Sequence, residues 1–479
     1  MIKQDQLVKI IGKKNIIDKL DVLDGYSGDM SLVKNVKPDC ILKPNSAEEV
    51  KEIVKLARET GTPLLPVSSG WPHFRGDTVP STSGVVVVDL SNMKKIIRVD
   101  RRNRVAMFEP GVTFKELTDA VAKEGLRLNM PLKPRETKSV VGSLLEREPV
   151  IMPKYQWDIA DPLACIEIIF GTGDIFRTGS AAGSGTIEEQ WAAGGAQKEA
   201  AGPSAASWYR LVQGSQGTMG IVTWASARCE LLPKLEDPYF AVAETPARLL
   251  QAVHWLIRLR LVNECMILNR ENIAAITGQN PDIPAWVLFF NVAAYDYFPE
   301  ERMKGQLDDI KGVMERSDLR PVKIISGIKA SEFLENTRKP SPDIHWKLRR
   351  KGNCEDIFFL TTFNKVEEMV EIVRRVGEEA GYPISDAGIY LQPLVQGSTC
   401  HCEFNLFYDP NNPQETARIK ELTKMATYEL LAKGAFFSRP YGENTRMIMN
   451  RDAASVWALK KVKAILDPDG IMNPGKLCF

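Results

Sequence analysis

The sequence predicts an α+β protein made of two units that differ in character. Its 479 residues are enough to bury more than one core. Residues 1–231 carry many short helix and strand signals, whereas residues 232–435 alternate longer strands with amphipathic helices. The second pattern is typical of one antiparallel sheet covered by helices on one face.

The first unit opens with a clear helix signal. Ser46 to Glu49 form a capping box, and apolar residues follow at helical spacing from Val50 to Leu56. A second capping box, Thr113 to Glu116, opens another helix. Three apolar runs predict strands, at 62–67, 85–90 and 105–110. The Gly-, Ala- and Ser-rich segment 179–203 predicts a long mobile connection, whose length in a compact unit points to function.

In the second unit the period of the apolar residues switches between two and 3.6. Strands are predicted at 238–244, 286–295, 357–363, 385–396 and 402–408. Helices are predicted at 246–262, 299–316, 365–380 and 413–433.

The loop Pro66–Asp77, with the sequence PVSSGWPHFRGD, is the most informative segment of the chain. It joins two predicted strands, and its Ser, Gly and Pro residues expose backbone N–H groups and hydroxyls together. Such a concave nest suits a diphosphate. The alternative is a surface loop that is rich in turn-forming residues.

Four more segments join this loop in a resemblance to a known family. They are SVVGSLLER at 139–147, IEIIFGTGDIFRT at 166–178, GSQGTMGIVT at 214–223 and LDPDGIMNPGK at 466–476. With the surrounding order of helices and strands, they resemble the vanillyl-alcohol oxidase and p-cresol methylhydroxylase superfamily of FAD-dependent oxidoreductases. The resemblance implies an FAD-binding domain at 1–231, a substrate or cap domain at 232–435, and a C-terminal return to the FAD-binding domain at 436–479.

The resemblance also implies which residues contact FAD. They are Pro66, Val67, Ser68, Ser69, Gly70, Trp71, Pro72, His73, Ser139, Val140, Gly142, Ser143, Gly217, Gly220, Ile221, Val222 and Asn473. Tyr441 stands where many members carry a histidine linked covalently to the flavin, and His73 is the other candidate for such a link. We predict non-covalent FAD.

Four residues are the candidates for catalysis. Arg439 occupies the place of the arginine in the family's Tyr-Arg pair beside the flavin, with Ser438 in place of the tyrosine, and Tyr441 follows it. A flavin that accepts a hydride gains negative charge, which a nearby cation stabilises. His401 matches a histidine in the cap of the vanillyl-alcohol branch, where it lines the substrate pocket. In a strand, His401 and Glu403 share one face, and Cys400 and Cys402 the other.

Arg75 is the sharpest departure from the family pattern. The vanillyl-alcohol branch has a tyrosine there that helps to bind the substrate phenolate. A guanidinium instead suits a carboxylate, so Arg75 and Arg439 together indicate an anionic substrate. Contact with the diphosphate, or simple solvation, are the alternatives for Arg75. The branch's acidic residue is not matched either, and Glu136 is a candidate substitute.

These features predict an FAD-dependent oxidoreductase that removes a hydride from a C–H bond next to a hydroxyl or an aromatic ring. An FAD-dependent 2-hydroxy-acid dehydrogenase is the alternative, although the metal motif of that branch is missing. A flavoprotein subunit with a mainly structural or electron-transfer role in a complex is the third hypothesis. The electron acceptor (oxygen, a cytochrome, a quinone or an electron-transfer flavoprotein) and the oligomeric state stay open.

Composition excludes several other classes of protein. With 62 basic and 61 acidic residues the net charge is +1, so no global field favours nucleic acid. There is no Rossmann GxGxxG fingerprint and no P-loop, and the eight cysteines include no Cys-x-x-Cys pair or metal-site spacing. No apolar run is as long as a membrane span, and no signal peptide is predicted. We expect a cytoplasmic protein with a small-molecule substrate.

Overall fold

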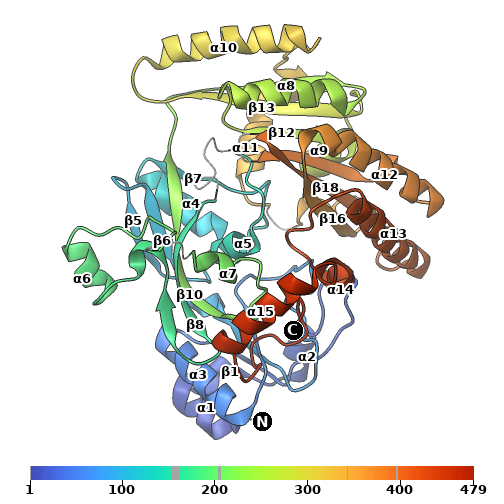
Figure 1. Cartoon of the computed structure of the whole chain (residues 1–479). Coiled ribbons are helices and arrows are strands. Elements are labelled where there is room, and N and C mark those ends of the chain that lie inside the picture. Colours follow the sequence, from blue (N-terminus) through green and yellow to red (C-terminus); the bar gives the residue numbers. More distant parts are fainter. Residues whose placement is uncertain (1, 154–160, 203–206, 342–343, 395–396) are drawn as a thin grey trace.

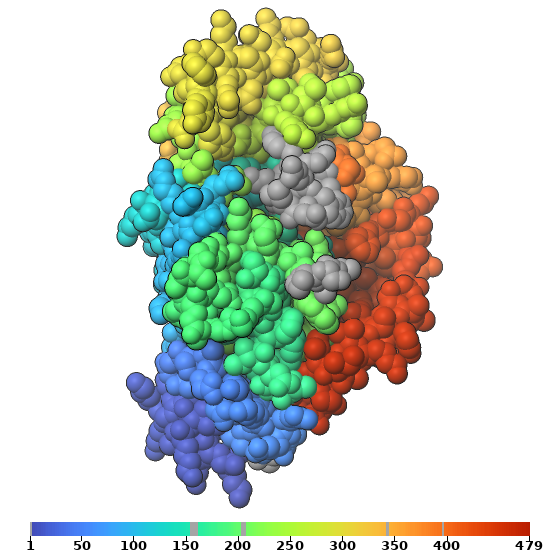
Figure 2. Space-filling model, turned by 60° about the vertical axis from the view of Figure 1, so that its left-hand side comes forward, coloured from blue at the N-terminus to red at the C-terminus, as the bar shows by residue number. Residues whose placement is uncertain are grey.

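The computed structural model describes residues 2–153, 161–202, 207–341, 344–394 and 397–479. In Figure 1 the chain forms two lobes, and the yellow and orange segments lie above the blue and green ones. The red C-terminal segment runs back down beside the lower lobe, and Figure 2 shows the same order of colours on the surface. Helices combine with mainly antiparallel sheets, which confirms the predicted α+β class.

The first sheet of the lower lobe carries the loop that the sequence singled out. Its strand order is β1 (Ile16–Ile17), β2 (Cys40–Leu42), β4 (Val86–Asp89) and β3 (Leu64–Val67). Strands β2, β4 and β3 run parallel, and helices α1 (Gln4–Ile11) and α3 (Ala47–Thr60) share a core with them. The loop therefore leaves the carboxyl end of a parallel strand, where open α/β sheets commonly bind ligands.

A second sheet completes the lower lobe. It has the order β5 (Ile96–Asp100), β6 (Val105–Phe108), β10 (Gly220–Leu231), β8 (Leu163–Phe170) and β9 (Ile175–Arg177), and β7 (Leu126–Leu128) pairs with the end of β10. Helices α4 (Phe114–Lys123) and α5 (Val140–Glu146) pack on it. The predicted Thr113 capping box opens α4. The side chain of Ser139 caps the N-terminus of α5.

The upper lobe contains one antiparallel sheet of six strands. Their order is β11 (Leu235–Ala243), β13 (Trp286–Ala294), β12 (Cys265–Asn269), β17 (Gly388–Leu394), β18 (Thr399–Tyr408) and β16 (Asn353–Thr361). One face shares a core with α8 (Pro246–Arg258), α10 (Pro299–Arg316), α12 (Val366–Glu379) and α13 (Pro413–Ala432). All six strands lie within residues 232–435, the range that we propose as the cap domain.

The second face of this sheet is also covered by helices, which differs from the one-sided packing expected. Helices α9 (Arg270–Thr277) and α11 (Ala330–Arg338) share a core with Phe240, Met266 and Phe289 of that face. The reason is visible in the strands, since central ones such as β12 and β13 are buried along their whole length. A sheet that is apolar on both faces needs cover on both.

The chain then returns to the lower lobe. After α14 (Thr445–Met449) and α15 (Ala453–Leu466), the Leu64 amide donates to the Ile471 carbonyl (2.8 Å), and the Asn473 amide donates to the Leu64 carbonyl (2.8 Å). The C-terminal residues thus extend the edge of the sheet that carries the loop.

The segment 179–203 contains regular structure, in contrast to the connection expected. Helix α6 (Ile187–Ala192) is opened by a reciprocal capping box between Thr186 and Glu189. Apart from 3-10 helices, the remaining short elements of the described chain are α2 (Leu20–Asp24), α7 (Tyr209–Val212), β14 (Ile324–Ile325) and β15 (Ile328–Lys329).

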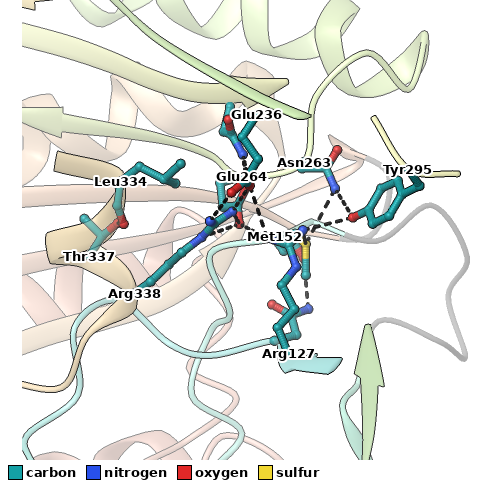
Figure 3. A network of polar contacts seen from close by, with 11 residues as sticks. Arg127, Met152, Glu236, Asn263, Glu264, Tyr295, Leu334, Thr337 and Arg338 are labelled. Atoms are coloured by element: carbon teal, nitrogen blue, oxygen red, sulfur yellow. Dashed lines mark hydrogen bonds and ion pairs between the residues drawn. The ribbon is translucent and has the colours of Figure 1, made fainter. Parts of the chain in front are cut away.

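A buried polar network joins the two lobes (Figure 3). Arg127 on β7 forms an ion pair with Glu264 of the upper lobe (3.1 Å) and donates to the Tyr295 hydroxyl (2.9 Å). Glu264 also accepts from Arg338 Nε (3.0 Å) and Asn291 (2.8 Å). Only 9% of Arg127 and 2% of Glu264 is exposed, so these charges are satisfied by one another rather than by water.

Arg127→Met is expected to lower the stability of the folded chain by about 3 kcal/mol. This is the low end for breaking a buried ion pair, because Arg338 and Asn291 still contact Glu264. Thermal unfolding of the purified protein measures the change. Arg248→Met, which removes an exposed ion pair with Asp318, is the control and should cost at most about 1 kcal/mol. Equal shifts for the two variants would contradict the structural role of the network.

Candidate functional site

A large cavity lies between the two lobes. The empty space between its walls, including the solvent at its open mouth, is about 1520 Å³. The predicted residues that line it are Pro66, Val67, Ser68, Ser69, His73, Arg75, Gly142, Gly217, Gly220, Val222 and Tyr441. Residues of the upper lobe close its far end: His345, Trp346, Lys347, Asp356, Tyr390 and Glu403.

One end of the cavity is a cradle of hydroxyl groups and bare backbone. The Ser139 amide donates to Ser69 Oγ (3.0 Å), which ties the loop to the start of α5. A Cβ atom on Gly142 would lie 3.2 Å from Ser68 Oγ and 3.3 Å from Ser69 Oγ. Gly217 has a φ of 72°, and a Cβ there would meet Pro66. Three segments thus approach one another closely only because glycine stands at the contact points.

The other predicted cofactor residues do not line the cavity, and two of them tie its loops together. Asn473 Nδ2 donates to the carbonyls of Gln216 (2.7 Å) and Asp77 (3.2 Å), which links two of the cavity loops. The Gly70 amide donates to the Thr137 carbonyl (2.9 Å). Ser139, Val140, Ser143 and Ile221 are buried, and Trp71 is 51% exposed beside Pro72.

Four charged residues form a clamp beside the cradle. Arg75 pairs with Glu146 (3.1 Å) and Glu148 (3.4 Å), and Lys138 pairs with the same two carboxylates. Burial opposes ionisation, but Lys138 and Arg75 lower the pKa of Glu148 to about 2. Burial likewise opposes the charge on Arg75, yet Glu146 and Glu148 raise its pKa. Glu148 and Arg75 are therefore both charged at neutral pH.

The four candidate catalytic residues surround one aromatic ring, that of Phe358. The guanidinium carbons of Arg439 and Arg75 lie 4.4 Å and 5.0 Å from its centroid. The ring centroids of His401 and Tyr441 are each 6.2 Å away. The sequence alone did not indicate Phe358, although it lies in a predicted strand.

The register of the six-stranded sheet explains this grouping. Phe358 on β16 pairs with Glu403 on β18, and Glu403 pairs with Tyr390 on β17. Residues opposite one another in a sheet point to the same face, so the three side chains lie side by side. His401 and Glu403 share that face as predicted, because His401 Nε2 lies 3.1 Å from Glu403 Oε2.

Glu403 is the centre of a buried polar chain. It accepts from Lys347 Nζ (2.6 Å) and Asn405 Nδ2 (2.8 Å), and Lys347 also donates to Asp356 (2.5 Å). Burial opposes its charge, but Lys347 and His401 hold the pKa of Glu403 well below its usual range. Burial lowers the pKa of His401 despite Glu403, so the imidazole is neutral at neutral pH.

Arg439 is a buried cation at the site. It is 5% exposed, it forms no ion pair with any described residue, and its Nη1 has no hydrogen-bond partner there. Burial, together with the like charge of Arg75, lowers the pKa of Arg439 to about 10. The guanidinium therefore stays charged at neutral pH, without a counter-ion among the described residues.

The charges that line the large cavity nearly cancel. Its cations are Arg75, Arg135, Lys138 and Lys347, and its carboxylates are Asp77, Glu146, Glu148, Asp356 and Glu403. Burial lowers the pKa of both His73 and His345 well below the usual value, so these side chains add no charge. The described residues of the lining thus carry one more negative charge than positive. In the described part of the chain, no group of His, Cys, Asp and Glu could hold a metal ion, and no helix is long and apolar enough to cross a membrane.

Comparisons with known proteins agree with this geometry. Residues 38–179 match the model of the "FAD binding domain", and residues 399–477 match that of the "FAD linked oxidases, C-terminal domain". The chain belongs to the p-cresol methylhydroxylase type of FAD-linked oxidoreductases. FAD is its cofactor, and the cradle of Ser68, Ser69, Gly142 and Gly217 fits such a group, since hydroxyls and bare backbone meet there.

The relatives that match over nearly the whole chain have names that state different activities. The chain is 26% identical to the 4-cresol dehydrogenase [hydroxylating] flavoprotein subunit of Pseudomonas putida, over 98% of this chain and 93% of that one. It is 22% identical to glycolate oxidase subunit GlcD of Bacillus subtilis, over 99% and 96%. A crystal structure of p-cresol methylhydroxylase with substrate bound shares the fold, with a TM-score of 0.81 at 18% identity, over 100% and 98% of the two chains.

Proposed function

We propose that this FAD-linked oxidoreductase removes a hydride from a C–H bond next to a hydroxyl or an aromatic ring. The observation that supports this most is the convergence of Arg75, Arg439, His401 and Tyr441 on Phe358. Arg75 and Tyr441 line the cofactor cavity, whereas the other two side chains reach Phe358 from outside its lining. When bound, FAD supplies the two-electron acceptor. The acceptor that later takes the electrons from the flavin stays open.

His401 is our candidate for accepting the hydroxyl proton of an alcohol. Its ring is neutral, and Glu403 fixes its orientation through Nε2. If Nε2 carries the proton toward Glu403, Nδ1 is the basic nitrogen. The ionised Glu403 would stabilise the imidazolium that forms. Since burial keeps the pKa of His401 below its usual value, the basic form persists throughout the neutral range and is lost only in acid.

Arg439 is our candidate for stabilising the negative charge that hydride transfer creates. Three charged residues that affect the pKa of Arg439 after burial, Arg75, Glu148 and Glu403, line the cofactor cavity. The uncompensated guanidinium is thus close enough to act on that cavity electrostatically.

The lining charges favour an uncharged substrate. The described lining residues carry one excess negative charge, and the diphosphate of FAD adds further negative charge. A free anion would therefore be repelled from the cavity. The anion-binding role expected for Arg75 stays a prediction. The guanidinium of Arg75 already forms ion pairs with Glu146 and Glu148. We propose that Arg75 mainly holds these two carboxylates in place.

A 2-hydroxy acid is the second candidate substrate, and the unpaired Arg439 is the observation that favours it. A buried guanidinium without a counter-ion is suited to a carboxylate. The names of the relatives include glycolate oxidase and D-lactate dehydrogenase as well as 4-cresol dehydrogenase, so they favour neither candidate alone.

Anaerobic mixing of the yellow holoenzyme with candidate substrates tests this proposal. We expect aromatic alcohols or alkylphenols to bleach the flavin. Bleaching by 2-hydroxy acids alone would support the second candidate. A holoenzyme that no compound of either class bleaches would instead support the hypothesis of a structural or electron-transfer subunit.

We expect acid precipitation to release all the flavin into the supernatant. Tyr441 replaces the histidine of the family's usual link, and Nδ1 of His73 already lies 3.5 Å from Nη2 of Arg135. Absorbance of the pellet and the supernatant measures the distribution. Colour that stays in the denatured pellet would show a covalent link and contradict the prediction.

A further inference from the structure

A second cavity lies on the far side of the wall that closes the cofactor cavity. The empty space between its walls, including the solvent at its open mouth, is about 1340 Å³. Phe74, Arg75, Asp356 and Tyr441 line both cavities and thus form the wall between them. Arg439 and Phe358 line only the second cavity, so it is distinct from the space that fits FAD.

Three buried polar atoms of residues on the second cavity have no hydrogen-bond partner among the described residues. They are Nη1 of Arg439, Oε2 of Glu355 and Nη1 of Arg75, and of these Arg75 Nη1 still forms a 3.1 Å ion pair with Glu146. An unsatisfied buried polar group is costly, and a buried charge without a counter-ion costs more. A ligand that supplies an acceptor for Arg439 would remove that cost.

The rest of the lining is mostly apolar toward the interior. The side chains of Leu32, Val33, Ile357, Phe437, Met447 and Ile448 contribute to it. Arg75 and Asp356 add charge in the wall between the two cavities. The other charged residues lie toward the surface, where Lys420 and Glu443 form a 2.7 Å ion pair and Lys424 is exposed. The cavity therefore combines an apolar body with one uncompensated cation.

We propose that the second cavity binds a carboxylate carried on an apolar body, and that Arg439 takes the carboxylate. A guanidinium can donate two parallel hydrogen bonds to a carboxylate, and desolvation strengthens them. The carboxylate has two sources of the same chemistry: the distal end of the substrate itself, or a separate carboxylic acid that acts as an effector. This inference does not depend on the proposed hydride transfer.

Glu355 makes the binding depend on pH. Burial, with the negative charges of Asp356 and Asp29, raises its pKa to about 8. Its carboxyl is therefore mostly neutral at pH 7 and ionised at pH 9, where it repels a bound carboxylate. The other charged groups near it or on the cavity are Lys347, Glu443, Arg75, Arg439, Lys420, Glu421 and Lys424. Affinity should fall as the pH rises through about 8, and Glu355→Gln should remove much of that fall.

Isothermal titration of the oxidised holoenzyme with benzoate tests the proposal. We expect saturable binding at pH 7 that weakens about tenfold or more in Arg439→Met, since a hydrogen bond to a charged group contributes roughly that much. Arg446→Met, seven residues along the chain and exposed, should bind benzoate as the wild type does. Ile448→Trp fills the cavity without touching a charge and should also weaken binding.

The possible results of this titration distinguish the proposal from its alternatives. Absence of benzoate binding to the flavin-loaded wild type, or equal affinity in the wild type and both cavity variants, would overturn the proposal. Benzoate that competes with an alcohol in flavin reduction supports the distal end of the substrate as the source, and binding without competition supports a separate acid. Because calorimetry needs no turnover, a failure to find any reducing substrate would count against the proposed function alone.

Discussion

Replacement of Gly142 by valine is expected to leave the protein folded but largely without flavin. A Cβ at this position would already lie 3.2–3.3 Å from the hydroxyl oxygens of Ser68 and Ser69, and the valine methyl groups extend further into the cradle. Overpacking of this kind costs about 1–3 kcal/mol. Flavin retention should therefore weaken roughly 5- to 150-fold, since each 1.4 kcal/mol is a factor of ten.

The ratio of flavin to protein absorbance after gel filtration measures the loss. Gly305→Val is the matched control, because Gly305 is also a helical glycine, but a Cβ atom added there would meet no other atom within 4 Å. The space around Gly305 beyond its own helix backbone is thus open, and the variant should retain flavin like the wild type. If Gly142→Val keeps a full complement of flavin, the start of α5 does not contact the cofactor.

Removal of the Arg439 charge should have the largest effect on the reaction itself. With an uncharged aromatic alcohol as substrate, we expect Arg439→Met to slow flavin reduction about 10²-fold, the lower end for loss of one charge-stabilising donor. The apparent dissociation constant of such a substrate should change much less, because the positive charge is needed mainly in the transition state.

Rapid mixing over a range of substrate concentrations separates these two quantities. Arg439→Lys keeps a charge at the site and should recover part of the rate, whereas Arg446→Met should match the wild type. A variant in which only the dissociation constant rises would show that Arg439 binds substrate and does not stabilise the transition state.

Local sequence predicted those parts of the molecule that local chemistry determines. Ser46 and Thr113 cap their helices through contacts three residues along the chain. His401 and Glu403 share a face because strand side chains alternate. The capping box of Thr186 and Glu189 is an equally local signal, but the Gly- and Ala-rich composition around it favoured an irregular connection over α6.

The missed residues depend on contacts between segments far apart in the chain. Arg75 meets Glu148 across 73 residues, and Lys347 meets Glu403 across 56. Phe358 became the centre of the site only through the pairing of β16 with β18, a register that no single strand reveals. The same holds for α9 and α11, whose apolar faces have meaning only beside the buried strands that they cover.

The most direct test of the proposed hydride removal is anaerobic stopped-flow reduction of the flavin by an aromatic alcohol, compared with the same alcohol deuterated at the carbon that bears the hydroxyl. The account predicts that the flavin bleaches and that deuterium slows the bleaching, because the C–H bond breaks in that step. Equal rates for the two alcohols would place another step in control. An absence of bleaching with every alcohol and alkylphenol tried would contradict the proposed reaction.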